Sequence, residues 1–232
     1  MFLRRALDDA RFYQANRRDY DRGQARSMVL PRADFEALIP VLERKMPLVL
    51  RVFRESDIRQ AIALAADYKV RVVLLSASEG WKAADALAKA GIPVIADPLD
   101  NLPSRFESLS ASLENVPKLM KAGVMVAFAT TGDALENRYR ALAVANGISR
   151  DQALAAITKN PAEIWGIADS YGTLEKGKDA DVVIWSGDPL ELSSIPTALF
   201  IRGQAQNLSS RQSKLRDRYK NLKSAEPPFG YR

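Results

Sequence analysis

The chain has 232 residues, of which 47% are hydrophobic and 27% are charged, with a formal net charge of +6 at pH 7. These values are ordinary for a soluble globular protein, and a chain of this length buries about 70% of its unfolded surface without needing disulfides or metal to fold. No segment approaches the ~18 apolar residues of a membrane span, and the early arginines do not precede the apolar run of a signal peptide. We therefore expect no membrane insertion and, for the chain as given, a cytoplasmic location.

The sequence opens with two charged stretches, 7–20 and 35–44, that we expect to form helices of an outer layer. Since no strand precedes them, the chain is expected to start in the middle of an architecture. Basic residues lie mostly near the two ends of the chain, where they are mixed with Asp and Glu. No platform of aromatic and basic residues accompanies them, so we do not expect binding to nucleic acid.

The middle of the chain alternates between strand and helix patterns. Apolar runs predict four strands, at 48–52, 70–75, 92–96 and 124–129. Helical patterns follow them at 57–69, where Ser56 is the expected N-cap, at 79–90, where Gly91 is the expected end, and at 113–122. Strand–helix units in succession predict an α/β fold with a parallel sheet and right-handed crossovers.

The last third of the chain no longer alternates regularly between strand and helix patterns. Helices are expected at 133–146, after Ser149, and after Asn160, which would cap a helix that begins at Pro161. Beyond them, two short strands around a Gly-Lys-Asp turn and a third strand ending at Gly203 predict a small β unit. We thus expect three parts: an α/β part at 1–170, a β unit at 171–205 and a charged helical or disordered tail at 206–232.

The run "ALAAITKNPAEIWGIADSYGTLEKGKDADVVIWSGDPLE", Ala153–Glu191, resembles the C-terminal signature of the amidohydrolase superfamily, in its imidazolonepropionase-like branch. The resemblance implies a metal-dependent TIM barrel with a small β-sandwich built from both chain ends. This chain would correspond to the last four barrel strands and the C-terminal part of the sandwich, a partial barrel. The Asn, Pro, Gly and Asp residues of the signature itself are expected to cap a helix and shape a hairpin.

The resemblance also implies where functional side chains lie, because a barrel collects its active site at the carboxyl ends of its strands. Family members hold divalent metals through histidines on the first, fifth and sixth strands, often a carboxylated lysine on the fourth, and an aspartate on the eighth. The first and fourth strands have no counterpart here. The other positions fall on Arg51 or Phe53 for the fifth strand, Ser76 for the sixth, with Glu79 matching the acid that follows it, and Thr131 or a displaced Asp133 for the eighth.

None of these positions holds its expected ligand, and the sequence contains no His or Cys. Zinc needs about four N, S or carboxylate ligands, so we expect no metal cofactor unless missing ligands are supplied from elsewhere. Arg51 is interpreted either as a clamp on a substrate carboxylate or as a structural partner of Glu55 or Asp97. Asp97, Asp100 and Asn101 share one strand-end loop and are interpreted in two ways. They form a carboxylate pair for acid–base work or a hard-cation site, or they shape turns before Pro98 and Pro103, which is the favoured interpretation.

Three functions remain open, and whether the chain is an enzyme is one of the open questions. The first is a degenerate relative that binds a small ligand, such as an anion, or acts structurally, and the substituted ligand positions favour it. The second is the C-terminal part of a metal-dependent hydrolase acting on non-peptide carbon–nitrogen bonds. The third is a metal-free enzyme built on Arg51, Glu79, Asp97 and Asp133.

Half of an eight-stranded barrel would leave two open sheet edges and one apolar face. Val49, Val73, Ile95 and Val126 lie in its expected strands. We expect this surface to be covered by self-association about a two-fold axis, by the chain's own N-terminal helices, or by a missing N-terminal half. Self-association is favoured over the helices, because they carry many charges.

Overall fold

The computed structural model describes residues 2–100, 102–129, 145–191 and 193–220, which form two compact units, Met1–Thr173 and Leu174–Arg232. The candidate residues Asn101, Thr131 and Asp133 lie outside the described residues. Unit 1 contains the strand–helix part and unit 2 the small β part. None of the described helices is long and apolar enough to cross a membrane.

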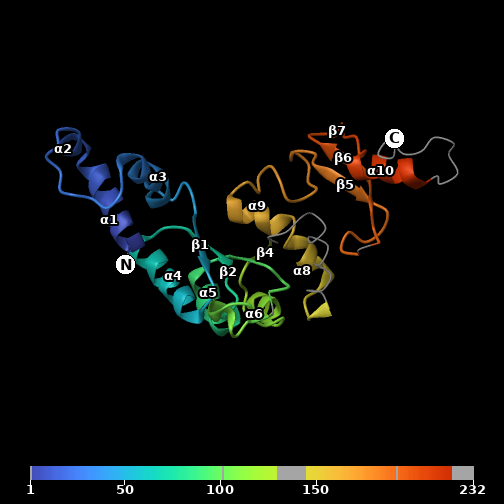
Figure 1. Ribbon diagram of the computed structural model, residues 1–232, viewed down its shortest axis with the longest axis horizontal. Helices are drawn as coiled ribbons and strands as arrows, with labels where there is room; N and C mark the ends of the chain where they lie inside the picture. The colour runs from blue at the N-terminus through green and yellow to red at the C-terminus, as the bar shows by residue number, and fades with distance from the viewer. Residues whose placement is uncertain (1, 101, 130–144, 192, 221–232) are drawn as a thin grey trace, which may run out of the picture. The chain divides into compact units, whose positions relative to one another are not determined.

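A four-stranded parallel sheet forms the centre of unit 1 (Figure 1). Its strands lie in chain order: β1 (Leu48–Val52), β2 (Val72–Ser76), β3 (Val94–Ala96) and β4 (Val126–Phe128). The register pairs Val49 with Val73, Leu75 with Ile95, and Ile95 with Ala127. The prediction of four consecutive parallel strands is confirmed. β1 matches its predicted range, and β2, β3 and β4 are one, two and three residues shorter than their apolar runs.

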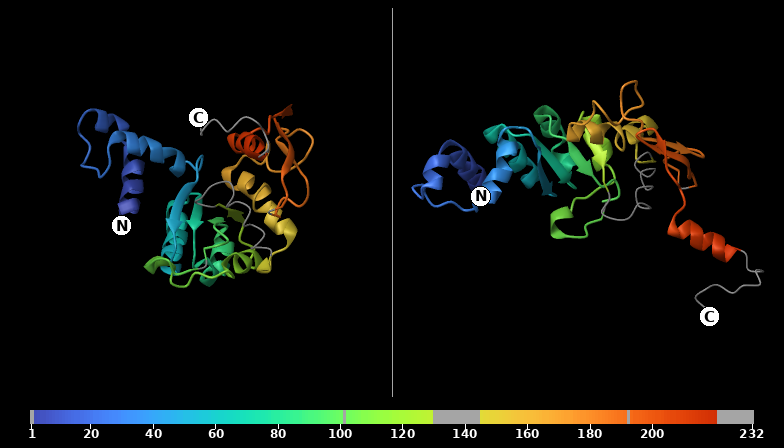
Figure 2. Two further views of the ribbon diagram at one scale, coloured as in Figure 1. Left: turned by 45° about the vertical axis from the view of Figure 1, so that its right-hand side comes forward. Right: turned by 90° about the horizontal axis from the view of Figure 1, so that it is seen from above.

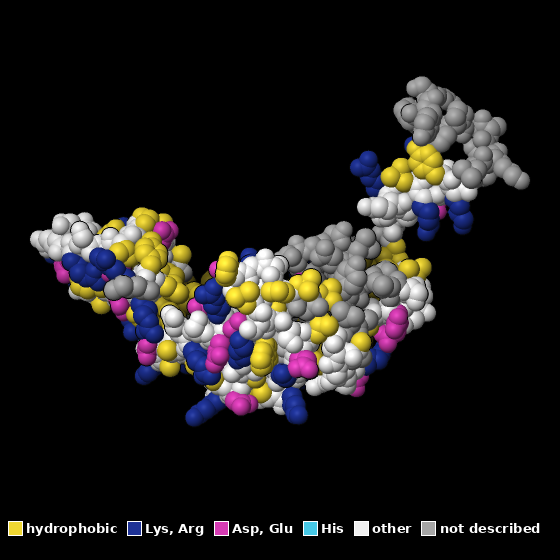
Figure 3. All heavy atoms as spheres, turned by 60° about the horizontal axis from the view of Figure 1, so that its bottom comes forward, with side chains coloured by type: hydrophobic (Ala, Val, Ile, Leu, Met, Phe, Trp, Pro, Cys, Tyr) yellow, Lys and Arg dark blue, Asp and Glu magenta, His cyan; other side chains and the backbone are white. Residues whose placement is uncertain are grey.

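Three helices cover one face of this sheet: α4 (Glu55–Tyr68), α5 (Ala84–Ala90) and α6 (Asn115–Lys121) (Figures 1 and 2). Side chains from alternate strand positions fill the space between sheet and helices, and Leu74, Val94 and Val126 are fully buried there. On the solvent side, Lys and Arg side chains are interspersed with Asp and Glu (Figure 3). The outer surface is therefore mixed in charge rather than uniformly basic.

The other face of the sheet is covered by α9 (Lys159–Trp165). Ile164 packs there against Val73, Ile95 and Ala127, and all four side chains are buried. Val49 of β1 remains 39% exposed on this face. The expectation of a fully open apolar face is thus wrong for β2 to β4 and holds for β1, because α9, which follows β4 in the sequence, packs back onto the sheet.

The N-terminal helices pack mainly on one another. They are α1 (Phe2–Ala15), α2 (Arg17–Asp21) and α3 (Arg32–Leu42), around a buried cluster of Ala10, Tyr13 and Phe35. The buried Asp9 accepts a hydrogen bond from the Val29 N–H at 2.8 Å and pairs with Arg26 at 2.6 Å. The Tyr68 hydroxyl at the end of α4 donates to Asp8 at 2.8 Å, which fastens α1 to the strand–helix part.

Two predicted helix starts are corrected. The N-cap of α4 is Arg54 rather than Ser56, whose hydroxyl instead donates to Asp57. The N-cap of α9 is Thr158, while the Asn160 amide donates to the Val126 carbonyl of β4 at 2.7 Å. For Asn160, a contact with a distant strand replaces the expected local cap, whereas Ser56 contacts its sequence neighbour. The helix after Ser149, α8 (Arg150–Ala155), has the predicted cap as a full capping box.

The predicted helix 79–90 is also divided. A 3₁₀ turn, η1 (Gly80–Lys82), precedes α5, which ends at Gly91 in the left-handed conformation as expected. A second 3₁₀ turn, η2 (Phe106–Ser108), lies in the loop after β3.

Unit 2 holds an antiparallel sheet of β5 (Val182–Trp185), β6 (Pro196–Ile201) and β7 (Gln204–Ala205), followed by α10 (Arg211–Lys220). A strand expected before the Gly-Lys-Asp turn is wrong, since residues 173–175 have no strand pairing. The third strand forms around the Arg202–Gly203 turn instead. The Asp181 carboxylate accepts a hydrogen bond from the Arg202 N–H at 2.7 Å and fixes this turn.

Candidate functional site at the carboxyl ends of the strands

The sequence-predicted residues that the structure describes all lie at or just beyond the carboxyl ends of β1, β2 and β3. Arg51 pairs in register with Leu75, and Val52 with Ser76, so β1 and β2 end side by side. Because parallel strands end at one edge of a sheet, Arg51, Phe53, Ser76, Glu79 and Asp97 lie around this edge.

Arg51 is an exposed cation on the face of the sheet that α9 covers. Alternate residues of β1 are exposed, and Arg51 shares its side of the strand with Val49. Neither expected structural partner pairs with it. Glu55 instead binds Arg59 through two hydrogen bonds of 2.8 and 2.9 Å, and Asp97 accepts the Leu99 N–H at 2.9 Å.

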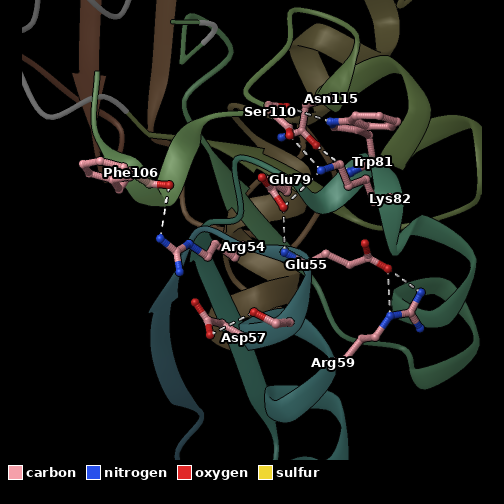
Figure 4. Close-up of polar contacts among 11 residues, drawn as sticks. Arg54, Glu55, Asp57, Arg59, Glu79, Trp81, Lys82, Phe106, Ser110 and Asn115 are labelled. Atoms are coloured by element: carbon pink, nitrogen blue, oxygen red, sulfur yellow. Dashed lines mark hydrogen bonds and ion pairs between the residues drawn. The ribbon is translucent and has the colours of Figure 1, made fainter. Parts of the chain in front are cut away.

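Two further arginines gather around Phe53, and the sequence analysis missed both. The Arg105 guanidinium lies over the Phe53 ring, 4.7 Å from its centroid. Arg54 donates to the Phe106 carbonyl at 3.3 Å, which fastens the loop after β3 to the end of β1 (Figure 4). The sequence "SRFES" in that loop, which contains Arg105 and Phe106, could have indicated this contact, because an arginine guanidinium can stack on the ring of an aromatic residue elsewhere in the chain. The loop exposes Leu102, Phe106 and Leu109 by 68%, 78% and 63%.

Ser76 ends β2 in an unusual backbone conformation. Ser76 and Ala77 both have positive φ, 77° and 47°, which costs energy for residues with a Cβ. The turn is held by the Ala77 N–H, which donates to the Val52 carbonyl at 2.8 Å, and by the Asn115 amide, which donates to the Ala77 carbonyl at 3.0 Å. Backbone strain of this kind persists where surrounding contacts impose it, as they do here.

Glu79 belongs to a polar cluster between the start of α4 and η1 (Figure 4). Its carboxylate accepts the Glu55 N–H at 3.1 Å and pairs with Lys82 at 3.3 Å, with 12% of its side chain exposed. Lys82 also donates to the Ser110 hydroxyl at 2.8 Å. Burial alone would raise the pKa of Glu79, but the Glu55 N–H and Lys82 outweigh it and the pKa lies below its usual value. Glu79 is therefore an ionised carboxylate whose charge is paired with Lys82 and the Glu55 N–H of the same chain.

Asp97 and Asp100 lie together in the turn after β3. The buried Ser78 hydroxyl donates to Asp100 in a short hydrogen bond, and Asp97 accepts the Leu99 N–H as an Asx turn does. Burial, together with the nearby Asp100 charge, raises the pKa of Asp97. The turn interpretation accounts for these contacts.

The residues at these strand ends do not fit the divalent metal that the family resemblance implies. Arg51 is a cation, Phe53 offers no donor atom, and Ser76 offers one neutral hydroxyl, which is a poor ligand for a transition metal. Within the described ranges, no three His, Cys, Asp and Glu side chains are grouped so that they could hold a metal ion. The donor set suits an anion better than a cation.

Three hollows of unit 1 lie elsewhere. The first, of about 470 Å³, lies at the amino ends of the strands and is lined by Arg71, Val73 and Ile164 among others. The second lies beside Trp81 and Lys118, and the third beside Lys121 and Ile148. None of these three hollows is lined by Arg51, Ser76 or Asp97.

Comparison with known proteins agrees with this architecture. Residues 53–214 match the model of the amidohydrolase family. An amidohydrolase from Thermotoga maritima superposes with a TM-score of 0.77 at 28% identity, covering 88% of this chain and 54% of that one. The predicted partial barrel is thereby confirmed.

Curated relatives match over shorter stretches. An imidazolonepropionase of Rhizobium meliloti is 33% identical over 118 residues, 47% of this chain and 27% of the relative. A 5-methylthioadenosine/S-adenosylhomocysteine deaminase of Desulforudis audaxviator is 30% identical over 113 residues, 43% of this chain and 25% of the relative. The matched part thus spans about a quarter of these two relatives and about half of the Thermotoga protein. Since the family model matches well over half of the sequence, this chain belongs to the amidohydrolase family and resembles its imidazolonepropionase-like members.

Proposed function

We propose that this chain is a metal-independent member of the amidohydrolase family that binds a small organic anion at the carboxyl ends of its strands. The observation that carries the proposal is Arg51, an exposed guanidinium for which the described residues supply no side-chain partner. It stands at one of the two positions that the resemblance assigns to the fifth-strand metal ligand. At this position the guanidinium of Arg51 replaces the bound metal ion that the resemblance implies.

The surroundings of Arg51 favour a carboxylate that carries an apolar or aromatic group. A guanidinium binds a carboxylate through two parallel hydrogen bonds, and Arg54 and Arg105 add positive charge near Phe53. The exposed ring of Phe106 offers apolar contact to the rest of such a ligand. Glu79 does not oppose the ligand strongly, because its charge is paired with Lys82.

Benzoate is a suitable probe, because it joins a carboxylate to a ring. We expect benzoate at low ionic strength to raise the melting temperature of the protein, and Arg51→Met to weaken binding by about 10- to 100-fold, as the loss of a charged hydrogen-bonded pair predicts. Arg18→Met is the matched control, since Arg18 is an exposed arginine of α2 and its replacement changes the net charge equally. Equal binding by the wild type and Arg51→Met would contradict the proposal.

The metal content of the purified protein tests the other half of the proposal. We expect zinc, measured by elemental analysis after gel filtration, to lie well below one equivalent. Near-stoichiometric zinc would favour a second candidate, the C-terminal part of a metal-dependent hydrolase acting on non-peptide carbon–nitrogen bonds. The observation behind that candidate is coverage, because this chain spans 54% of the Thermotoga protein.

A further inference from the structure

One edge of β1 carries backbone hydrogen-bonding groups that pair with no strand among the described residues. On its paired side, the Leu48 N–H donates to the Arg71 carbonyl and the Val52 carbonyl accepts the Ala77 N–H, both at 2.8 Å. In a parallel ladder, the N–H and C=O of every second residue point to the same neighbour. Those of Val49 and Arg51 therefore point away from β2, where the described residues supply no strand.

We propose that two copies of this chain pair β1 with β1 across a two-fold axis, antiparallel and centred on Leu50. In this register Val49 of each copy lies opposite Arg51 of the other. These are the residues whose N–H and C=O groups face the edge, so each Val49–Arg51 pair exchanges two hydrogen bonds. The two pairs together satisfy every edge group of both strands, and the two sheets become one continuous sheet.

The side chains of β1 are self-complementary in the same register. On the face that α4 covers, Leu50 meets Leu50 and Leu48 meets Val52, and all three residues are partly exposed in the single chain. Pairing removes their apolar surface from water.

The charge of Arg51 selects this register on the opposite face. A register with Arg51 facing Arg51 would place like charges directly opposite each other, which destabilises a strand pair. The proposed register instead places each Arg51 opposite the 39% exposed Val49, whose side chain can contact the arginine methylenes. A second copy is therefore the occupant that fits both the backbone groups and the side chains of this edge.

Cysteine cross-linking tests the register directly, because the native sequence contains no Cys. Leu50 on the axis is a non-hydrogen-bonded pair with Cα atoms about 4.5 Å apart, within disulfide range. Val52 lies on the same face of the strand, but its two copies would be roughly 14 Å apart. We expect Leu50→Cys to form a covalent dimer under mild oxidation and Val52→Cys to remain monomeric on a non-reducing gel.

Sedimentation of two charge variants gives a second test that does not depend on cysteine. Val49→Glu places a carboxylate opposite Arg51 of the second copy, and Val49→Lys places an ammonium group there. With two such pairs per dimer, we expect Glu to tighten and Lys to weaken the dimer dissociation constant, each by about 2- to 30-fold at low salt. A general effect on strand stability would shift both variants in one direction.

The outcomes separate the proposal from its alternatives. A wild type that sediments as a monomer at tens of micromolar would overturn it. So would equal cross-linking of Leu50→Cys and Val52→Cys, or a dimer that responds identically to Glu and Lys at position 49. If Leu50→Cys fails to fold, as a loss of its circular dichroism signal would show, the two charge variants at position 49 still test the proposal, because Val49 is an exposed edge residue.

Discussion

Replacing Glu79 with glutamine or alanine tests the polar cluster that joins β2 to α4. The N-cap of α4, Arg54, makes no side-chain cap hydrogen bond, so the Glu79 carboxylate, from a segment 24 residues away, takes that role on the Glu55 N–H. A carboxylate at a helix N-terminus is also stabilised by the helix dipole. We expect both variants to destabilise unit 1.

The expected loss of unfolding free energy follows from the two contacts of Glu79, with the Glu55 N–H and with Lys82. At 3.1 and 3.3 Å both lie at the long end of the hydrogen-bond range, so each is assigned the lower limit for a charged bond, about 1.5 kcal/mol. Glu79→Ala removes both and should cost about 3 kcal/mol of unfolding free energy. Glu79→Gln keeps an acceptor for the Glu55 N–H but loses the charge, so it should cost roughly 1 kcal/mol.

The cost of Glu79→Gln should depend on pH in a defined direction. The pKa of Glu79 in the folded protein lies below 4.5, the ordinary value for a glutamate, so the unfolded chain binds the proton more readily. The stability that the charge provides is therefore fully present above pH 4.5 and is lost as the pH falls through the folded pKa. Urea unfolding of wild type and variant, from pH 7 down to pH 3, measures the difference.

A difference between wild type and Glu79→Gln that stays constant or grows toward pH 3 would refute the reasoning. Glu114→Gln is the control, because Glu114 also forms an ion pair with a lysine, Lys118 at 2.7 Å, but its side chain is 68% exposed. Water screens such a pair, so its removal should have little effect on stability at any pH.

Three further variants test the packing beside α9 and in the N-terminal helices. Gly172→Ala should cost about 2–3 kcal/mol of unfolding free energy, because φ at Gly172 is +96° and an added Cβ would lie 2.7 Å from the Ala162 Cβ. Gly177→Ala is the control and should cost about 1 kcal/mol, because Gly177 has the same φ but no atom within 4 Å of the added Cβ. Urea unfolding midpoints compare the two variants. Asp9→Ala should cost about 2–4 kcal/mol, because it leaves the partly buried Val29 N–H and Arg26 without their shared acceptor. Equal urea midpoints for variant and wild type would contradict this.

The order of elements could be predicted from the sequence because local signals specify it. The strands of the parallel sheet are mainly apolar runs. Gly91 ends α5 in the left-handed backbone conformation, and Ser149 caps the start of α8 by accepting the Gln152 N–H, so both signals are local in sequence. The family signature added the identity of the architecture. It could not give the register, which the structure shows to pair Val49 with Val73 and Arg51 with Leu75.

The contacts that shape the candidate site were not predictable because they join distant segments. Glu79 was expected at the strand ends, but its use as a cap for α4 depends on a partner 24 residues away. Arg105 reaches Phe53 across 52 residues, and Asn160 leaves its expected capping role for a carbonyl of β4. Short sequence patterns carry no information on such pairs, since either residue alone is compatible with many neighbours.

The charges at the strand ends explain why an anion suits this site better than a metal. Among the acidic side chains there, Glu79 is paired with Lys82, and burial makes ionisation of Asp97 less favourable, as its raised pKa indicates. Among the described residues, Arg51 has no such neutralising partner, and Arg54 and Arg105 bind a carbonyl and a ring, which leave their charges in place. A divalent cation would therefore meet repulsion without a compensating ligand set, whereas a carboxylate would meet attraction and hydrogen-bond donors. We therefore propose that the strand ends to which the resemblance assigns a cation prefer an anion in this chain.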